Sequence, residues 1–185
     1  MEAAVAAFPE LAVGRSVIRL VRGDITELEV DAFVFYAQPD LALGSGFGGA
    51  IGVRGGASIQ KELKELAAEG PVPTGEVVVS EGGKLRADYI LHAVGPRFKE
   101  ADTEAKLGKT MRNCLARAEE RGIKSLAFPL MGAGYYGIPN EVSARVMLET
   151  LATHLVGDTG IAEVLICVFD TPQFNAVEAA LAARS

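Results

Sequence analysis

Two glycine-rich stretches of the chain have the residue types that bind phosphate, one running from Gly44 to Gly49 and the other from Gly132 to Gly137. Missing side chains let the main chain approach a ligand, and successive amides at a helix start form a partly positive concavity for phosphate oxygens. Each stretch alone is also typical of a flexible loop or a tight turn. The pair favours a diphosphate held from two sides, with the tyrosines on the attached ribose. The residues concerned are Gly44, Ser45, Gly46, Phe47, Gly132, Ala133, Gly134, Tyr135 and Tyr136.

The first stretch does not match two common nucleotide-binding motifs. No Gly-Lys-Ser/Thr ending follows the first stretch, so it is not a Walker loop. The first stretch follows the second predicted strand, and no acidic residue stands about twenty positions further on at the end of the next strand, which excludes the dinucleotide fingerprint.

A carboxylate and an aromatic ring follow two further predicted strands. Asp24, followed by Ile25, has two interpretations that the residues leave equal: its carboxylate accepts from an exocyclic amine such as that of adenine, or it bonds its own backbone in a turn. Phe169 either stacks on a purine or packs in the core. We interpret His92 as a core histidine, because it has no partner at motif spacing. No catalytic triad is visible, and no metal or cofactor is predicted.

The elements that position these residues follow an α/β pattern, in which apolar strands alternate with helices that cover both faces of a sheet. Continuous apolar strands favour a mostly parallel sheet, whose carboxyl edge collects the loops described above. The first dozen residues fit either a short helix or a loose arm, so we divide the chain into an arm or extra element (1–15) and one domain (16–185). The predicted strands are Ser16 to Val21, Ala32 to Ala37, Glu76 to Ser80, Tyr89 to Val94, Ser125 to Leu130 and Glu163 to Phe169. The predicted helices are Ser58 to Glu69, Thr103 to Arg121, Asn140 to Leu155 and Pro172 to Ala183.

Composition narrows the class of partner. The 185 residues carry a formal charge of −6, which opposes a nonspecific grip on nucleic acid. Arg15 to Arg22, the longest positive cluster, is interrupted by apolar residues. No signal peptide or membrane-spanning run is visible, so we expect a cytoplasmic protein without membrane contact, and a monomer by default.

Five segments, in this order, resemble the macro domain family from about Ser16 to about Leu181. They are Val21-Arg22-Gly23-Asp24-Ile25-Thr26, the strand from Asp31, the loop from Leu43 to Gly49, Tyr89-Ile90-Leu91-His92-Ala93-Val94-Gly95-Pro96, and Phe128-Pro129 through Gly137-Ile138-Pro139. The resemblance implies a three-layer α/β/α fold with a mixed, mostly parallel sheet of about six strands, whose crevice takes ADP-ribose.

The same resemblance implies a role for each matched segment. Asp24 corresponds to the acid that reads adenine, and Phe169 lies beside the adenine. Gly44 to Phe47 and Ala133 to Tyr136 correspond to the two phosphate loops. Asn113-Cys114-Leu115-Ala116, together with the Val-Phe-Asp ending, is similar to the ligand-reading macro domain of a variant histone.

Departures from the family pattern bear on catalysis. Where de-ADP-ribosylating relatives usually have Asn-Ala-Ala-Asn, this chain has Phe35-Tyr36-Ala37-Gln38, and the Asp and His that follow the first loop correspond to Gly48 and Gly52. Tyr36 and Gln38 are left as possible distal-ribose contacts. Losing positioned polar groups costs orders of magnitude in rate. We therefore favour a binding module and leave the catalytic residues unassigned.

Two alternatives stay open. The first is a hydrolase that acts on ADP-ribose 1″-phosphate or on mono-ADP-ribosylated substrates by a route that does not need the missing groups, in which a diphosphate oxygen of the ligand orients the water. Gln38, Tyr136 and Asp40 are the nearby polar groups to test for it. The second is an adaptor that binds no nucleotide, which the two glycine loops disfavour.

Overall fold

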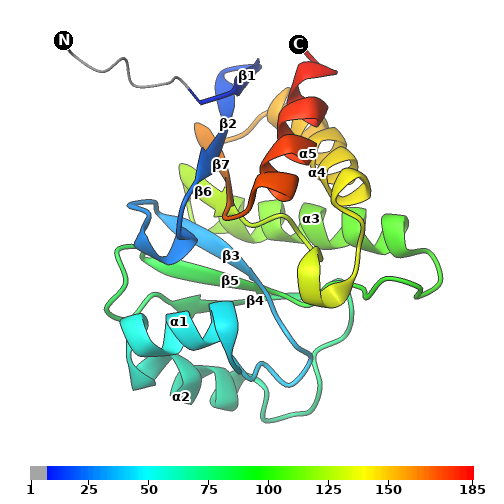
Figure 1. Cartoon of the computed structure of the whole chain (residues 1–185). Coiled ribbons are helices and arrows are strands. Elements are labelled where there is room, and N and C mark those ends of the chain that lie inside the picture. Colours follow the sequence, from blue (N-terminus) through cyan, green and yellow to red (C-terminus); the bar gives the residue numbers. More distant parts are fainter. Residues whose placement is uncertain (1–7) are drawn as a thin grey trace.

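A mixed sheet of seven strands forms the centre of the structure, a computed structural model that describes residues 8–185 (Figure 1). The strand order is β1-β2-β7-β6-β3-β5-β4. The five inner strands are parallel, whereas β1 and β4 pair antiparallel at the two edges. The bounds are β1 Glu10–Val13, β2 Ser16–Arg22, β3 Ala32–Tyr36, β4 Val77–Glu81, β5 Tyr89–Ala93, β6 Ser125–Phe128 and β7 Glu163–Val168.

Helices cover both faces of this sheet and make three layers (Figure 1). On one face lie α1 (Gly46–Gly55) and α2 (Ala57–Leu66), and on the other lie α3 (Thr103–Glu120), α4 (Asn140–Leu155) and α5 (Thr171–Ala182). Alternate residues of β3 divide between the two cores, because successive side chains of a strand point to opposite faces. The predicted three-layer α/β fold is confirmed, with seven strands instead of about six.

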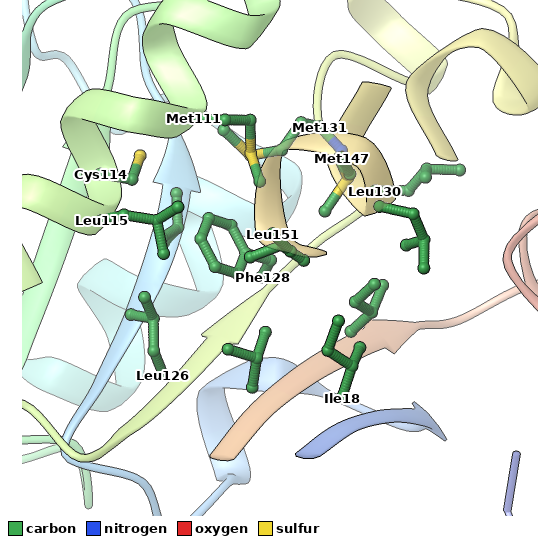
Figure 2. Packing of buried hydrophobic residues seen from close by; sticks show 14 of the residues in the cluster. Ile18, Met111, Cys114, Leu115, Leu126, Phe128, Leu130, Met131, Met147 and Leu151 are labelled. Carbon is green, nitrogen blue, oxygen red and sulfur yellow. The ribbon is translucent and has the colours of Figure 1, made fainter. Parts of the chain in front are cut away.

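The larger core lies between the sheet and the helices α3 to α5. Figure 2 shows Met111 and Leu115 of α3 and Leu151 of α4 around the ring of Phe128 on β6, all fully buried. Cys114 of α3 is also buried there, as expected for a small apolar residue. Among residues 8–185, no helix has both the length and the apolar composition needed to cross a bilayer.

Two elements were not expected from the sequence. Residues 10–13 form strand β1 on the edge of the sheet, where a short helix or a loose arm was expected, and residues 1–7 lie outside the described part. Helix α1 is not among the predicted helices; it begins at Gly46, so most of the first glycine stretch is itself the first helical turn. Tertiary packing explains both, because Val13 and Ile51 are buried and outweigh weak local propensity.

Candidate functional site

A cavity of about 960 Å³ opens where the parallel strands β2, β3, β6 and β7 end. Its volume lies in the range of small-molecule sites, and the carboxyl edge of a parallel sheet is where such sites form. Of the predicted binding residues, only Gly134 is absent from its wall. Gly134 is exposed and begins the short 3-10 helix η2 (Gly134–Tyr136). The predicted residues in the wall are Asp24, Ile25, Tyr36, Gln38, Gly44, Ser45, Gly46, Phe47, Gly132, Ala133, Tyr135, Tyr136 and Phe169.

Asp24 lies in the cavity wall, and its carboxylate is held on both oxygens. The main-chain N–H and the hydroxyl of Thr26 donate to Oδ1 at 2.9 and 2.6 Å. Nη1 of Arg54 donates to Oδ2 at 2.6 Å. A carboxylate has about four acceptor positions, so these three donors leave about one for a further N–H. The turn interpretation of Asp24 is therefore correct, and it leaves room for the other.

Two neighbouring ionisable groups in the cavity wall, Asp24 and Cys167, have shifted pKa values. Burial raises the pKa of Asp24, but the hydrogen bonds from Thr26 and the charge of Arg54 outweigh it, so the net pKa lies below the ordinary value. Burial, with a smaller effect from the charge of Asp24, raises the pKa of the Cys167 thiol to about 11. Asp24 is thus ionised and Cys167 is neutral near pH 7.

The first glycine stretch forms one side wall. Ser45 precedes α1 in extended conformation, and its side chain makes no capping hydrogen bond. The N–H groups of the first helical turn are therefore free of a side-chain cap, and this turn lines the cavity. Gly48 sits so close to the preceding chain that a Cβ would lie 1.7 Å from the Leu43 carbonyl oxygen. Gln60 of α2 clamps this chain, since it accepts from the Leu43 N–H at 3.0 Å and donates to the Leu41 carbonyl at 3.3 Å.

The second glycine stretch and Tyr36 also line the cavity. Tyr36 donates its hydroxyl to the Pro96 carbonyl and fits a slot beside two glycines: a Cβ on Gly95 or Gly132 would lie 2.3 or 3.2 Å from its hydroxyl oxygen. Gly132 also has φ +71°, which side-chain-bearing residues rarely adopt. The Tyr36 and Tyr136 rings lie 4.6 Å apart between centroids. Burial raises the pKa of both tyrosines, so neither is a base near neutral pH.

Two aromatic rings stand exposed in the cavity wall, Phe169 at 78% and Tyr135 at 80%. Phe169 follows β7 and is held by the start of α5, where Asp170 accepts from the Gln173 N–H at 2.8 Å. The core interpretation of Phe169 is therefore wrong, and the ring is free to stack on a planar group.

Two other side chains considered from the sequence, His92 and Asp40, do not line the cavity. His92 is buried, as expected; it bonds the Ser80 hydroxyl through Nε2 at 2.8 Å, and burial lowers its pKa to about 3. Asp40 is exposed and accepts from the Ala42 N–H. Within residues 8–185, no three His, Cys, Asp or Glu side chains gather as a metal site.

Sequence reasoning missed Arg54, Gln60 and Gln173. Arg54 and Gln60 act on loops 17 to 30 residues away, a spacing with no local signature. Gln173 lines the cavity from the first turn of α5, beside Phe169. Gln173 lies in the first turn of a predicted helix that follows a strand end, where ligand sites of parallel sheets form, and this was the one signal in the sequence that could have identified it.

The fold and cavity together define a three-layer α/β domain with a nucleotide-sized cleft between two glycine loops. Residues 37–147 match the family model for the Macro domain. A macro domain-containing protein of Streptomyces griseus is 40% identical over 172 residues, 91% of this chain and 96% of that protein. An uncharacterized protein of Sulfurisphaera tokodaii is 38% identical over 160 residues, 86% of this chain and 87% of that protein.

Solved structures agree with the sequence comparison. A mutant of the Oceanobacillus iheyensis macrodomain with ADPR superposes with a TM-score of 0.91 at 26% identity, covering 96% of this chain and 98% of that one. The Trypanosoma brucei macrodomain in complex with ADP-ribose gives a TM-score of 0.79 at 29% identity, covering 89% and 68%. The chain belongs to the macro domain family.

Proposed function

We propose that this chain binds ADP-ribose, or an ADP-ribosyl group on another molecule, in the cavity between the two glycine stretches. The observation that carries the proposal is one cavity whose wall contains Asp24, Tyr136 and residues of both glycine stretches. Structural neighbours that hold ADPR or ADP-ribose support the ligand class.

Each part of the ligand has a chemically suited wall. The one acceptor position left on Asp24 suits the exocyclic amine of adenine, and the exposed ring of Phe169 suits its face. First-turn amides of α1 suit the diphosphate. The distal ribose meets Tyr36, Gln38 and Tyr136.

We further propose that binding occurs without efficient turnover. Within the described residues, Asp24 is the one carboxylate in the cavity wall, and no histidine lies there. In the proposed binding mode, Asp24 is already occupied by the adenine. The Gly48 position has no room for a side chain, and Phe35 presents an apolar ring where the hydrolytic pattern has Asn. Gln38 and Tyr136 line the cavity but are not ionised near pH 7, so neither supplies a general base. The hydrolase alternative then depends on the diphosphate oxygen of the ligand to orient the water.

Calorimetric titration with ADP-ribose tests the binding, for which we expect one site per chain. A titration without heat at high protein concentration would refute it. Incubation with ADP-ribose 1″-phosphate and with a mono-ADP-ribosylated protein tests the rest, and we expect no multiple turnover. A cytoplasmic, monomeric state and the lack of a nonspecific nucleic-acid interaction stay predictions from the sequence.

A further inference from the structure

Arg54 connects Asp24, the proposed adenine contact, to α1, the helix whose first turn is the proposed diphosphate contact. Its Nη1 lies 2.6 Å from Oδ2 of Asp24, 2.8 Å from the Thr26 hydroxyl and 3.1 Å from Oε1 of Glu27. It stands in the last turn of α1, the helix whose first turn, at Gly46, is the first glycine stretch. The residue therefore ties the base end of the cavity to the far end of the phosphate-facing helix.

This contact fixes the direction in which Asp24 accepts. Thr26 holds only Oδ1, so the carboxylate could still rotate about its bond to Cβ. The Arg54 contact to Oδ2 removes that freedom, and the remaining acceptor position then has one direction. Arg54 and Gly46 are eight residues apart on one helix, so the acceptor and the phosphate-facing amides keep a separation set by a rigid element about 12 Å long.

A fixed acceptor separates purines by the group at position 6. A 6-amino group donates a hydrogen bond to the carboxylate. A 6-oxo group instead presents a lone pair, so the carboxylate loses its water and gains no donor in return. We propose that Arg54 is a positioning residue that sets base selectivity, so that the site takes 6-amino purine diphosphates and rejects the 6-oxo counterparts. This inference rests on the proposed function.

Paired titrations with ADP-ribose and with its hypoxanthine counterpart, inosine diphosphate ribose, test the inference. For the wild-type chain we expect a preference for ADP-ribose of about tenfold or more, the value of one charge-assisted hydrogen bond. In Arg54→Gln we expect ADP-ribose affinity to fall about tenfold and the preference to drop below about threefold. Arg54→Lys keeps the charge without the planar fork and is expected to lie between the two.

A double-mutant cycle separates positioning from a general loss of structure. Asp24→Ala alone should abolish the preference, and adding Arg54→Gln should then cost less than about threefold in ADP-ribose affinity. Lys61→Gln, which removes an exposed positive charge from α2, is the charge control and should change neither affinity. Thermal unfolding of each variant shows whether it is folded. If Arg54→Gln does not fold, Arg54→Lys replaces it in the cycle.

The outcomes distinguish the inference from the proposed function. If ADP-ribose binds and Arg54→Gln keeps the wild-type preference, or if the two losses add, Arg54 does not position Asp24 and the inference is overturned while the proposed function stands. If the wild-type chain binds neither nucleotide, the proposed function fails and the inference fails with it.

Discussion

At the scale of single residues, Asp24 combines a structural and a binding contact, and substitution separates them. Asp24→Ala removes the acceptor that faces the cavity, and we expect ADP-ribose affinity to fall about tenfold to a hundredfold, as for a hydrogen bond to a charged group. The same change removes the Thr26 and Arg54 contacts. Calorimetry measures the affinity, and Asp158→Ala, which removes an exposed carboxylate before β7, is the control. Equal affinities for the two variants would contradict this role of Asp24.

The sequence was a good guide to which residues line the cavity and a poorer guide to the partners that each side chain contacts. The order of strands and glycine stretches is enough to place Asp24 and Phe169 at one edge of the sheet, because parallel strands end together. Local sequence left the two interpretations of Asp24 equal, since the deciding partner, Arg54, lies 30 residues away. Tertiary contacts of this kind have no periodicity that can be read from the chain.

At the scale of elements, Gly48 explains why the first turn of α1 keeps its place. In Gly48→Ala the new Cβ would overlap the Leu43 carbonyl oxygen at 1.7 Å, so the loop or the helix start must shift. We expect both a loss of stability of about 1–3 kcal/mol, as for other overpacked sites, and weaker ADP-ribose binding. Gly52→Ala on the same helix is the matched control, because its Cβ would meet its nearest neighbour at 3.9 Å. A fully stable Gly48→Ala variant with wild-type affinity would refute the argument.

Gln60 holds the same loop from α2, and its two bonds can be removed separately. Gln60→Glu keeps an acceptor for the Leu43 N–H but loses the donor to the Leu41 carbonyl, and Gln60→Leu loses both. We expect ADP-ribose affinity to fall in the order wild type, Gln60→Glu, Gln60→Leu, because a loosened loop must be ordered again on binding. Titrations of the three proteins measure this order. Unchanged affinity in Gln60→Leu would show that the loop keeps its shape without the clamp.

Element prediction succeeded where packing and local preference agree. The helices α3, α4 and α5 have apolar residues at helical spacing, and all were predicted. The helix α1 contains five glycines among its ten residues, a composition that predicts a loop, and it forms because Ile51 is fully buried against the sheet. Strand β1 has only four residues and depends on pairing with β2, which local sequence does not show.

At the scale of the whole molecule, Glu119 joins α3, α4 and the segment that precedes β7, whereas the cavity lies where the parallel strands end. Its carboxylate accepts from His154 of α4 at 2.9 Å, from the Thr159 hydroxyl, and from the Gly160 N–H at 3.1 Å. Burial raises the pKa of Glu119, but these hydrogen bonds outweigh it and the net pKa is lowered. A lowered pKa in the folded state means that the ionised form stabilises the fold.

The sign of the pH dependence follows from that shift. The stabilisation by Glu119 is complete above the unfolded pKa of about 4.3 and is lost as the pH falls through the lower pKa of the folded state. At pH 7 we expect Glu119→Gln to lower the free energy of unfolding by about 1 kcal/mol, an amount reduced by partial exposure. Urea titrations between pH 7 and pH 3 should show the two curves converging below about pH 4. Glu120→Gln changes the neighbouring exposed residue and should leave the pH dependence of stability as in the wild-type chain. If the wild-type and Glu119→Gln curves stay parallel down to pH 3, the ionised carboxylate does not stabilise this junction, and the two helices and the loop before β7 are held by packing alone.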